Sequence, residues 1–67
     1  MLLVTINGER REIKENMTIE DILKDLGVMD KVMAVAVNMQ IVKKEEWGSF
    51  QPKEGDKIEF LGFTGGG

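Results

Sequence analysis

Apolar and polar residues alternate near the start of the chain, and this pattern predicts a β-hairpin. Every second residue of the segment 2–6 is apolar, which gives an extended strand one apolar face. Asn7 and Gly8 follow, and an Asn-Gly pair tolerates the two positive φ angles that a type I′ turn requires. We therefore expect a second strand over residues 10–14, paired with the first.

The pattern then changes from a period of two to the period of a helix. In the stretch MTIEDILKDLG, Thr18 suits the N-cap position and Asp21 stands where the partner of a capping box reaches back. Gly27 fits the left-handed position just past the helix end. The apolar stripe follows the i, i+3, i+4, i+7 spacing and consists of Ile19, Ile22, Leu23 and Leu26. A helix this short is not stable alone in water, so it must lie on a sheet.

Extended segments dominate the second half of the chain. The apolar run at residues 32–37 predicts a strand that is covered on at least part of both faces. Residues 41–42 fit a short edge strand, and the loop after them is expected to tuck Trp47 and Phe50 against the core. The last strand is expected over residues 57–63, where successive side chains point to opposite faces of the sheet. Ile58 and Phe60 then share one face, and the opposite face carries Glu59, Leu61 and Phe63.

The element order is therefore two strands, a helix, a strand, a short strand and a strand. We predict an α+β, β-grasp fold with a mixed sheet of four to five strands and one helix packed on a single face. The other face is left to solvent or to a partner. The domain is expected over residues 1–64, with a flexible glycine tail at 65–67, and Gly62 is expected to loosen the approach to that tail.

Composition narrows the chemistry that this fold can carry. The chain has 67 residues, enough for one small domain, and it has no cysteine and no histidine. Thiolate nucleophiles, imidazole bases and the commonest transition-metal ligands are therefore missing, and we expect no metal site and no bound cofactor. A net charge of −3 argues against nucleic acid as a partner. No run is apolar enough to span a membrane, and we predict a cytoplasmic protein.

The side chains that resemble functional groups have simpler structural interpretations. The acidic pairs Glu20-Asp21 and Glu45-Glu46 are expected to cap helices and to lie on the solvated surface, because neighbours in sequence do not face one another on a helix. Three methionines at irregular spacing are expected to fill gaps in the core rather than to bind a metal, namely Met29, Met33 and Met39. Trp47 is expected to be a packing residue.

The last residues carry the remaining candidates. Leu61 and Phe63 are expected on the open face, where an apolar patch beside the chain end would suit a docking surface. Gly65, Gly66 and Gly67 form either a frayed end or an arm of about 10 Å that enters a slot too narrow for any Cβ. In the second case the reactive group is the Gly67 carboxylate. This group is ionised at neutral pH and is a poor electrophile, so a partner enzyme would have to activate it, most simply with ATP.

The second half of the chain, VAVNMQIVKKEEWGSFQPKEGDKIEFLGFTGGG, resembles the ThiS family of sulfur carriers in thiamine biosynthesis. The shared features are a V-x-V-N strand end, a following I-V pair, a tryptophan, a G-D-x-I turn into the last strand and a Gly-Gly terminus. With the hairpin and the helix, the resemblance covers the whole chain. It places the family's Gly-Gly on Gly66 and Gly67, with Gly65 just before the motif.

This resemblance implies a ubiquitin-like protein cosubstrate rather than an enzyme. A ThiF-like adenylyltransferase would use ATP to adenylate the Gly67 carboxylate, and a sulfur donor enzyme would supply the sulfur for its thiocarboxylate. A ThiG-like thiazole synthase would take that sulfur to form the thiazole of thiamine. The residues expected to contact these partners are Gly65, Gly66, Leu61 and Phe63.

Other functions fit part of the same pattern. A MoaD-like carrier for molybdopterin synthesis shares the V-N strand end, the G-D turn and the Gly-Gly end, but that family tends to carry prolines shortly before its terminus, whereas Pro52 is the only proline here. A non-covalent ubiquitin-like binding module would use the open face alone and leave the tail inert. A protein modifier would be joined through Gly67 to a lysine of another protein.

Overall fold

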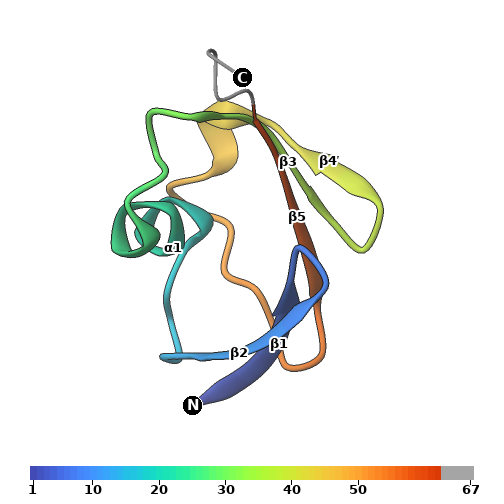
Figure 1. Ribbon diagram of the computed structural model, residues 1–67. Helices are drawn as coiled ribbons and strands as arrows, with labels where there is room; N and C mark the ends of the chain where they lie inside the picture. Colours follow the sequence, from blue (N-terminus) through green and yellow to red (C-terminus); the bar gives the residue numbers. More distant parts are fainter. Residues whose placement is uncertain (63–67) are drawn as a thin grey trace.

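The computed structural model describes residues 1–62 and contains one mixed sheet and one α-helix (Figure 1). In chain order the elements are β1 Leu2–Ile6, β2 Glu9–Ile13, α1 Ile19–Leu26, β3 Val32–Val37, β4 Gln40–Val42, the 3₁₀ turn η1 Lys44–Glu46 and β5 Lys57–Gly62. The predicted order of strands and helix is confirmed. Within the described residues no helix is long and apolar enough to cross a membrane.

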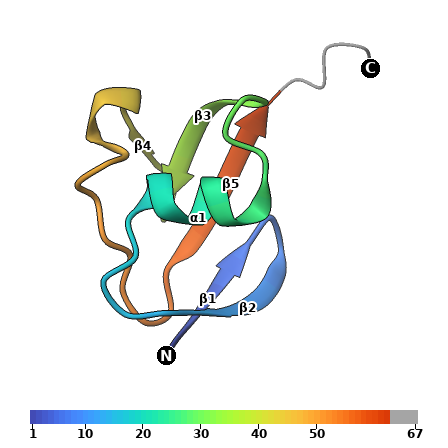
Figure 2. The same ribbon diagram turned by 90° about the vertical axis from the view of Figure 1, so that its left-hand side faces the viewer.

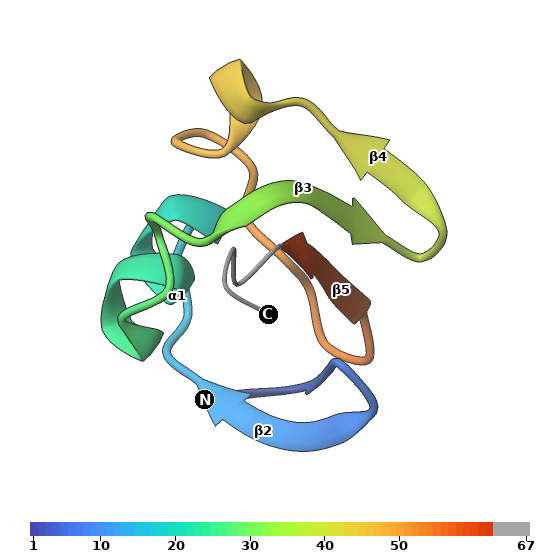
Figure 3. The ribbon, with the colours of Figure 1, turned by 45° about the horizontal axis from the view of Figure 1, so that its top comes forward.

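The strands lie in the order β2-β1-β5-β3-β4, so the last strand of the sequence is the central strand of the sheet. β1 and β5 are parallel, whereas the other neighbouring strands are antiparallel. Helix α1 crosses one face of this sheet, and no helix formed by residues 1–62 covers the second face (Figures 2 and 3). The predicted α+β, β-grasp architecture is confirmed, with all five strands in one sheet.

The core lies between the helix and the sheet. It is built from the apolar stripe of α1 and from alternate residues of the strands, among them Val4, Ile6, Val35 and Ile58. Trp47 is 1% exposed, and its indole Nε1–H donates to the carbonyl oxygen of Val42 at 3.0 Å. The expectation that Trp47 is a packing residue is confirmed, because one large side chain supplies much of the volume in so small a core.

Helix α1 begins and ends as its local sequence predicts. The Thr18 hydroxyl accepts a hydrogen bond from the Asp21 N–H, and the Asp21 carboxylate accepts one from the Thr18 N–H, which completes a capping box. Gly27 takes a φ of 72° and closes the helix. These local contacts set the ends of an element that owes its stability to burial of Ile19, Ile22 and Leu23.

Two tight turns form hairpins at the two edges of the sheet, one between β1 and β2 and the other between β3 and β4. Asn7 and Gly8 have φ values of 50° and 85°, as the predicted type I′ turn requires. Asn38 and Met39 have φ values of 52° and 71°, so the β3–β4 turn has the same hand without a glycine. Met39 is 91% exposed at this turn.

The prediction that all three methionines pack in the core is wrong for two of them. Met33 is 67% exposed at an irregularity in the β3–β5 pairing, where the register shifts between Val32 and Ala34, and Met39 is exposed at its turn. Only Met29 is partly buried against the core. Methionine is flexible enough to occupy either environment, so its spacing in the sequence did not distinguish them.

The hydrogen bond of Trp47 leads to a stability prediction. Trp47→Phe keeps an aromatic ring but removes the indole N–H and part of the buried volume, so we expect the free energy of unfolding to fall by about 2–3 kcal/mol. Chemical denaturation followed by circular dichroism measures the change. Ser49→Ala, at an exposed neighbouring position, serves as the control and should have a small effect. A loss for Trp47→Phe no larger than that of the control would contradict the assigned role.

Candidate functional site

The candidate site is the end of β5 and the face of the sheet around it. Leu61 is 50% exposed, whereas Phe60 is half-buried and packs against the core, as the alternation of the last strand predicts. Phe63, together with Gly65, Gly66 and Gly67, lies outside the described residues, and so the predictions for these four stay predictions. The boundary between a domain at 1–64 and a tail at 65–67 also stays a prediction.

Gly62 lies where two backbones approach each other closely. It is the last residue of β5 and pairs with Val32, and an added Cβ would clash with the carbonyl oxygen of Lys31 and lie 3.1 Å from the Val32 Cα. The absence of a side chain allows the end of β5 to approach the start of β3 closely. The expectation that Gly62 loosens the strand stays a prediction.

An apolar patch covers the open face beside Leu61. Leu61 pairs with Ala34, and on the next row Ile41 pairs with Ala36, so the four side chains share one face across three adjacent strands. Ile41 is 62% exposed, which is unusual for a β-branched residue in a small sheet. We call this set, Ala34, Ala36, Ile41 and Leu61, the open-face patch. The two alanine side chains are short, so the middle of the patch is shallower than its ends, where Ile41 and Leu61 project further from the sheet.

Two residues of opposite charge lie on β5 beside the open-face patch. Glu59 pairs with Ala36, and Lys57 pairs with Thr5, which places both charges on the same face of β5 as Leu61. Both side chains are exposed. An apolar centre with a charged rim is the usual composition of a surface that binds another protein.

Local structural contacts account for most of the acidic pairs considered as candidates. The Thr18 backbone N–H, and then its hydroxyl, lower the pKa of Asp21 below its ordinary value, in agreement with a capping role. Glu20 forms an ion pair with Lys24 at 2.9 Å, and the carboxylate of Glu46 accepts a hydrogen bond from the Lys43 N–H. The expectation of capping and surface roles for these acids is confirmed. No group of three acidic, histidine or cysteine side chains able to hold a metal occurs among residues 1–62.

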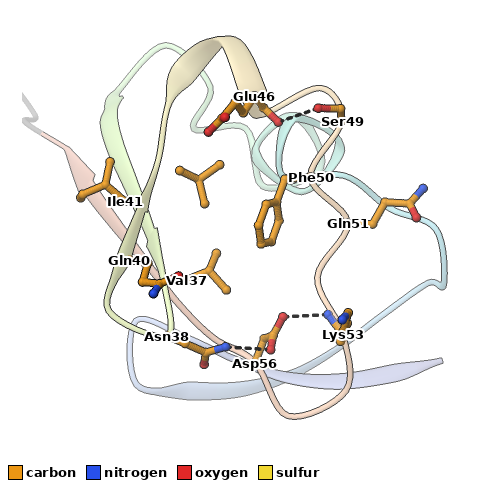
Figure 4. Close-up of a pocket in the computed structure, with 11 residues that line it drawn as sticks. Val37, Asn38, Gln40, Ile41, Glu46, Ser49, Phe50, Gln51, Lys53 and Asp56 are labelled. Atoms are coloured by element: carbon orange, nitrogen blue, oxygen red, sulfur yellow. Dashed lines mark hydrogen bonds between the residues drawn. The ribbon is translucent and has the colours of Figure 1, made fainter.

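A hollow of about 460 Å³ lies on the other side of the sheet, between β4 and the loop that precedes β5 (Figure 4). Phe50 and Val37 are part of its lining, together with polar groups that include Asp56. The two Asp56 oxygens accept from the Asn38 Nδ2 at 2.9 Å and from the Lys53 N–H at 2.8 Å. Its carboxylate is therefore engaged in holding two turns together.

Sequence reasoning identified Leu61 but missed the rest of the open-face patch. Val42 is buried and alternation then turns Ile41 outward, a signal that was present in the I-V pair. Its place on the same face of the sheet as Leu61 could not be predicted from local sequence, because it depends on the pairing of β3 with both β4 and β5. The two alanines were part of an apolar run and gave no separate signal.

Comparison with known proteins gives a consistent family match. The chain matches the ThiS family over residues 4–67. It is 27% identical to the sulfur carrier protein ThiS of Escherichia coli over 64 residues, which cover 96% of this chain and 97% of that protein. A crystal structure of the thiamine biosynthesis protein ThiS from Geobacter metallireducens superposes with a TM-score of 0.80 at 30% identity, covering 98% of this chain and 100% of that one.

Two longer proteins are also similar. The chain is 41% identical to a thiazole synthase of Paramagnetospirillum magneticum and 33% identical to one of Magnetococcus marinus, in each case over 64 residues. Each alignment covers 96% of this chain but 20% of the relative, so this chain spans about a fifth of their length.

The close approach at Gly62 gives a prediction for the end of β5. Gly62→Ala should lower the free energy of unfolding by about 1–3 kcal/mol, because its Cβ would meet the backbone of Lys31. Denaturation measures this loss, and amide hydrogen exchange at Leu61 shows whether the end of the strand has opened.

Gly48→Ala is the matched control. Its added Cβ would meet the Glu20 carboxylate oxygen at 2.9 Å, and this flexible side chain can move aside. We expect a much smaller loss there. Equal stability losses at the two glycines would contradict a specific backbone contact at Gly62.

Proposed function

The chain belongs to the ThiS family, and from this we propose that it is a sulfur carrier in thiamine biosynthesis. The single observation that carries the proposal is the match over almost the full length of both chains to the sulfur carrier protein ThiS of Escherichia coli. The family match extends to residue 67 and so includes the Gly66-Gly67 pair.

The proposed reaction takes place on the carboxylate of Gly67. The carboxylate oxygen attacks the α-phosphate of ATP, pyrophosphate leaves, and an acyl adenylate forms. A hydrosulfide ion supplied by the sulfur donor enzyme then attacks the acyl carbon, the bond from that carbon to the AMP oxygen breaks, and the departure of AMP leaves a thiocarboxylate on Gly67. Activation is needed because an ionised carboxylate is a poor electrophile. The chain has no cysteine, so its own side chains offer no thiol as an alternative carrier of the sulfur.

The proposed partners follow from the chemistry that this chain would need. A ThiF-like adenylyltransferase would supply the ATP site, and a sulfur donor enzyme would supply the sulfur, so the chain itself binds no cofactor. A ThiG-like thiazole synthase is proposed as the acceptor. The support is that a segment similar to this chain makes up a fifth of each of two proteins named thiazole synthase. Segments joined in one chain in some organisms often work together when they are separate.

The open-face patch is proposed as the surface that docks on these enzymes. It lies on the same strand as Gly62, so a partner that covers Leu61 is already close to the point where residues 63–67 begin. Phe63 would extend the patch, while Gly65 and Gly66 would pass through a slot that admits backbone only. Docking by the patch would thus bring the Gly67 carboxylate to the enzyme.

Intact mass spectrometry tests the reaction. After incubation with a ThiF-like enzyme and ATP we expect an AMP adduct, and after addition of a sulfur donor a mass gain that corresponds to the exchange of oxygen for sulfur. Fragmentation should place both changes on Gly67. A variant that lacks Gly67 is the control and should show neither change while its circular dichroism stays that of the folded protein.

The same experiment separates the alternatives. Failure of every ThiF-like enzyme tested to form the AMP adduct would overturn the proposed function and favour a non-covalent binding module. A thiocarboxylate that supports molybdopterin synthesis but not thiazole formation would instead favour a MoaD-like carrier. Isopeptide adducts on lysines of other proteins would indicate a protein modifier.

Leu61→Asp tests the docking surface. A charge in place of an exposed apolar side chain of the interface should raise the KM for the adenylyltransferase by about tenfold or more while leaving the free energy of unfolding nearly unchanged. Met39→Asp is the matched control, since it places the same charge at an exposed apolar residue outside the patch. Steady-state kinetics of pyrophosphate release measures both. An equal rise in KM for the two variants would argue against a local docking role for the open-face patch.

A further inference from the structure

We propose that Asn7 is a positioning residue for the reaction at the chain end. In this proposal its side chain completes the sheet beside the last residues of β5 and so sets the direction in which the chain leaves the domain. The inference rests on the proposed function, because it concerns how the Gly67 carboxylate is presented to an activating enzyme.

The need for such a residue comes from the unequal lengths of two neighbouring strands. β1 ends at Ile6, and its parallel pairing with β5 consists of two pairs, Thr5 with Lys57 and Ile6 with Ile58. β5 continues to Gly62. Among the described residues, therefore, the part of β5 after Ile58 has no strand beside it on the β1 side. On its other side it pairs with β3 as far as Gly62.

Asn7 occupies the place where β1 would have continued. Its backbone N–H donates to the Ile58 carbonyl oxygen at 2.9 Å, and its side-chain Oδ1 accepts from the Phe60 N–H at 2.8 Å. These bonds continue the parallel ladder by one further step, with an amide side chain in place of a backbone carbonyl. The two residues are 53 positions apart in the sequence.

The conformation of Asn7 explains how one residue can both turn the chain and extend the ladder. Its φ of 50° begins the β1–β2 turn, which leads the backbone away from β5. Asparagine tolerates this left-handed conformation better than most residues, and its short side chain carries an acceptor. Glycine would suit the turn equally well but would leave the Phe60 N–H without this acceptor.

The surroundings of Phe60 make this acceptor hard to replace. A hollow of about 230 Å³ lies between the β1–β2 hairpin and the end of α1, lined in part by Asn7, Leu26, Val28 and Phe60. Without the Asn7 side chain, the Phe60 N–H would face this space and water. A hydrogen bond to water would not fix the strand in the way that a bond to the hairpin does.

For the reaction, the proposed consequence is that the end of β5 is fixed where the chain leaves the sheet. Phe60 is held from the β1 side by the Asn7 side chain, and Gly62 is paired with Val32 on the β3 side. Gly67 is five positions beyond Gly62. Fixing the last described residues reduces the number of directions in which the following residues start, so less conformational freedom is lost when the carboxylate enters an enzyme.

The other hairpin provides a matched comparison. Asn38 also has a left-handed φ, 52°, and its Oδ1 accepts from the backbone N–H of Lys57 at 3.0 Å. The two asparagines therefore hold the same strand by the same kind of bond. Asn38 holds the start of β5, whereas Asn7 holds the part that leads to Gly62. Only the second should matter for presentation of Gly67.

Three variants test the proposal on the full chain. Asn7→Gly keeps the turn and removes the acceptor, Asn7→Asp keeps both, and Asn38→Gly removes the corresponding bond at the start of β5. Each is compared under conditions where circular dichroism shows it folded. Pyrophosphate release with the adenylyltransferase gives kcat and KM, and amide hydrogen exchange reports on the Phe60 N–H.

We expect Asn7→Gly to lower kcat about five- to tenfold and to speed exchange at Phe60 by at least as much, the effect of losing one hydrogen bond. KM should change little, because the open-face patch is untouched. Asn7→Asp should restore both values. Asn38→Gly should leave kcat and Phe60 exchange near those of the wild type, even where it lowers the melting temperature as much.

Two results would overturn the proposal. One is an equal fall in kcat for Asn7→Gly and Asn38→Gly, which would mean that general stability sets the rate. The other is a kcat for Asn7→Gly equal to that of the wild type. Both comparisons require that the wild-type chain is adenylated. Failure of the wild type is a failure of the proposed function, whereas a reactive wild type with either result above overturns the role of Asn7 alone.

Discussion

The structure depends on the backbone of β5, which must find hydrogen-bond partners on both sides because it is the central strand. β3 pairs with β5 from Ile58 to Gly62, whereas β1 pairs with only Lys57 and Ile58 on the other side. Two asparagine side chains each add one acceptor for this strand: Asn38 accepts from the Lys57 N–H and Asn7 accepts from the Phe60 N–H. In this way each hairpin fixes its own strands and also ties them to the central strand.

The domain is small, and for this reason one face of its sheet is covered by α1 while the other face is left uncovered among the described residues. Most of the large apolar side chains among the described residues lie between α1 and the sheet, where Trp47 and the helix stripe fill the core. The open face receives no covering element, and its small residues, Ala34 and Ala36, leave Ile41 and Leu61 standing out. A fold that covers only one side of its sheet thus leaves apolar side chains exposed on the other side.

The features that could be predicted from the sequence are those with local causes. Asn7-Gly8, the capping box of α1 and the alternation in β5 each depend on residues a few positions apart, and each was found where it was expected. The contacts that shape the candidate site have distant causes. Gly62 meets Lys31 across the sheet, and Asn7 bonds to Phe60 across 53 positions, so neither role leaves a local pattern.

The parallel pairing of β1 with β5 has a consequence for protein engineering. Ile6 is level with Ile58, so Met1 lies five residue steps back along the sheet and Gly62 four steps forward, nine steps in all. At about 3.3 Å per residue this separates them by roughly 30 Å, comparable with the longest dimension of the molecule, 34 Å. An affinity tag, a fluorophore or a fused domain attached at Met1 would therefore lie at the opposite end of the molecule from Gly62. At that position it would not block access of an enzyme to the residues that follow Gly62.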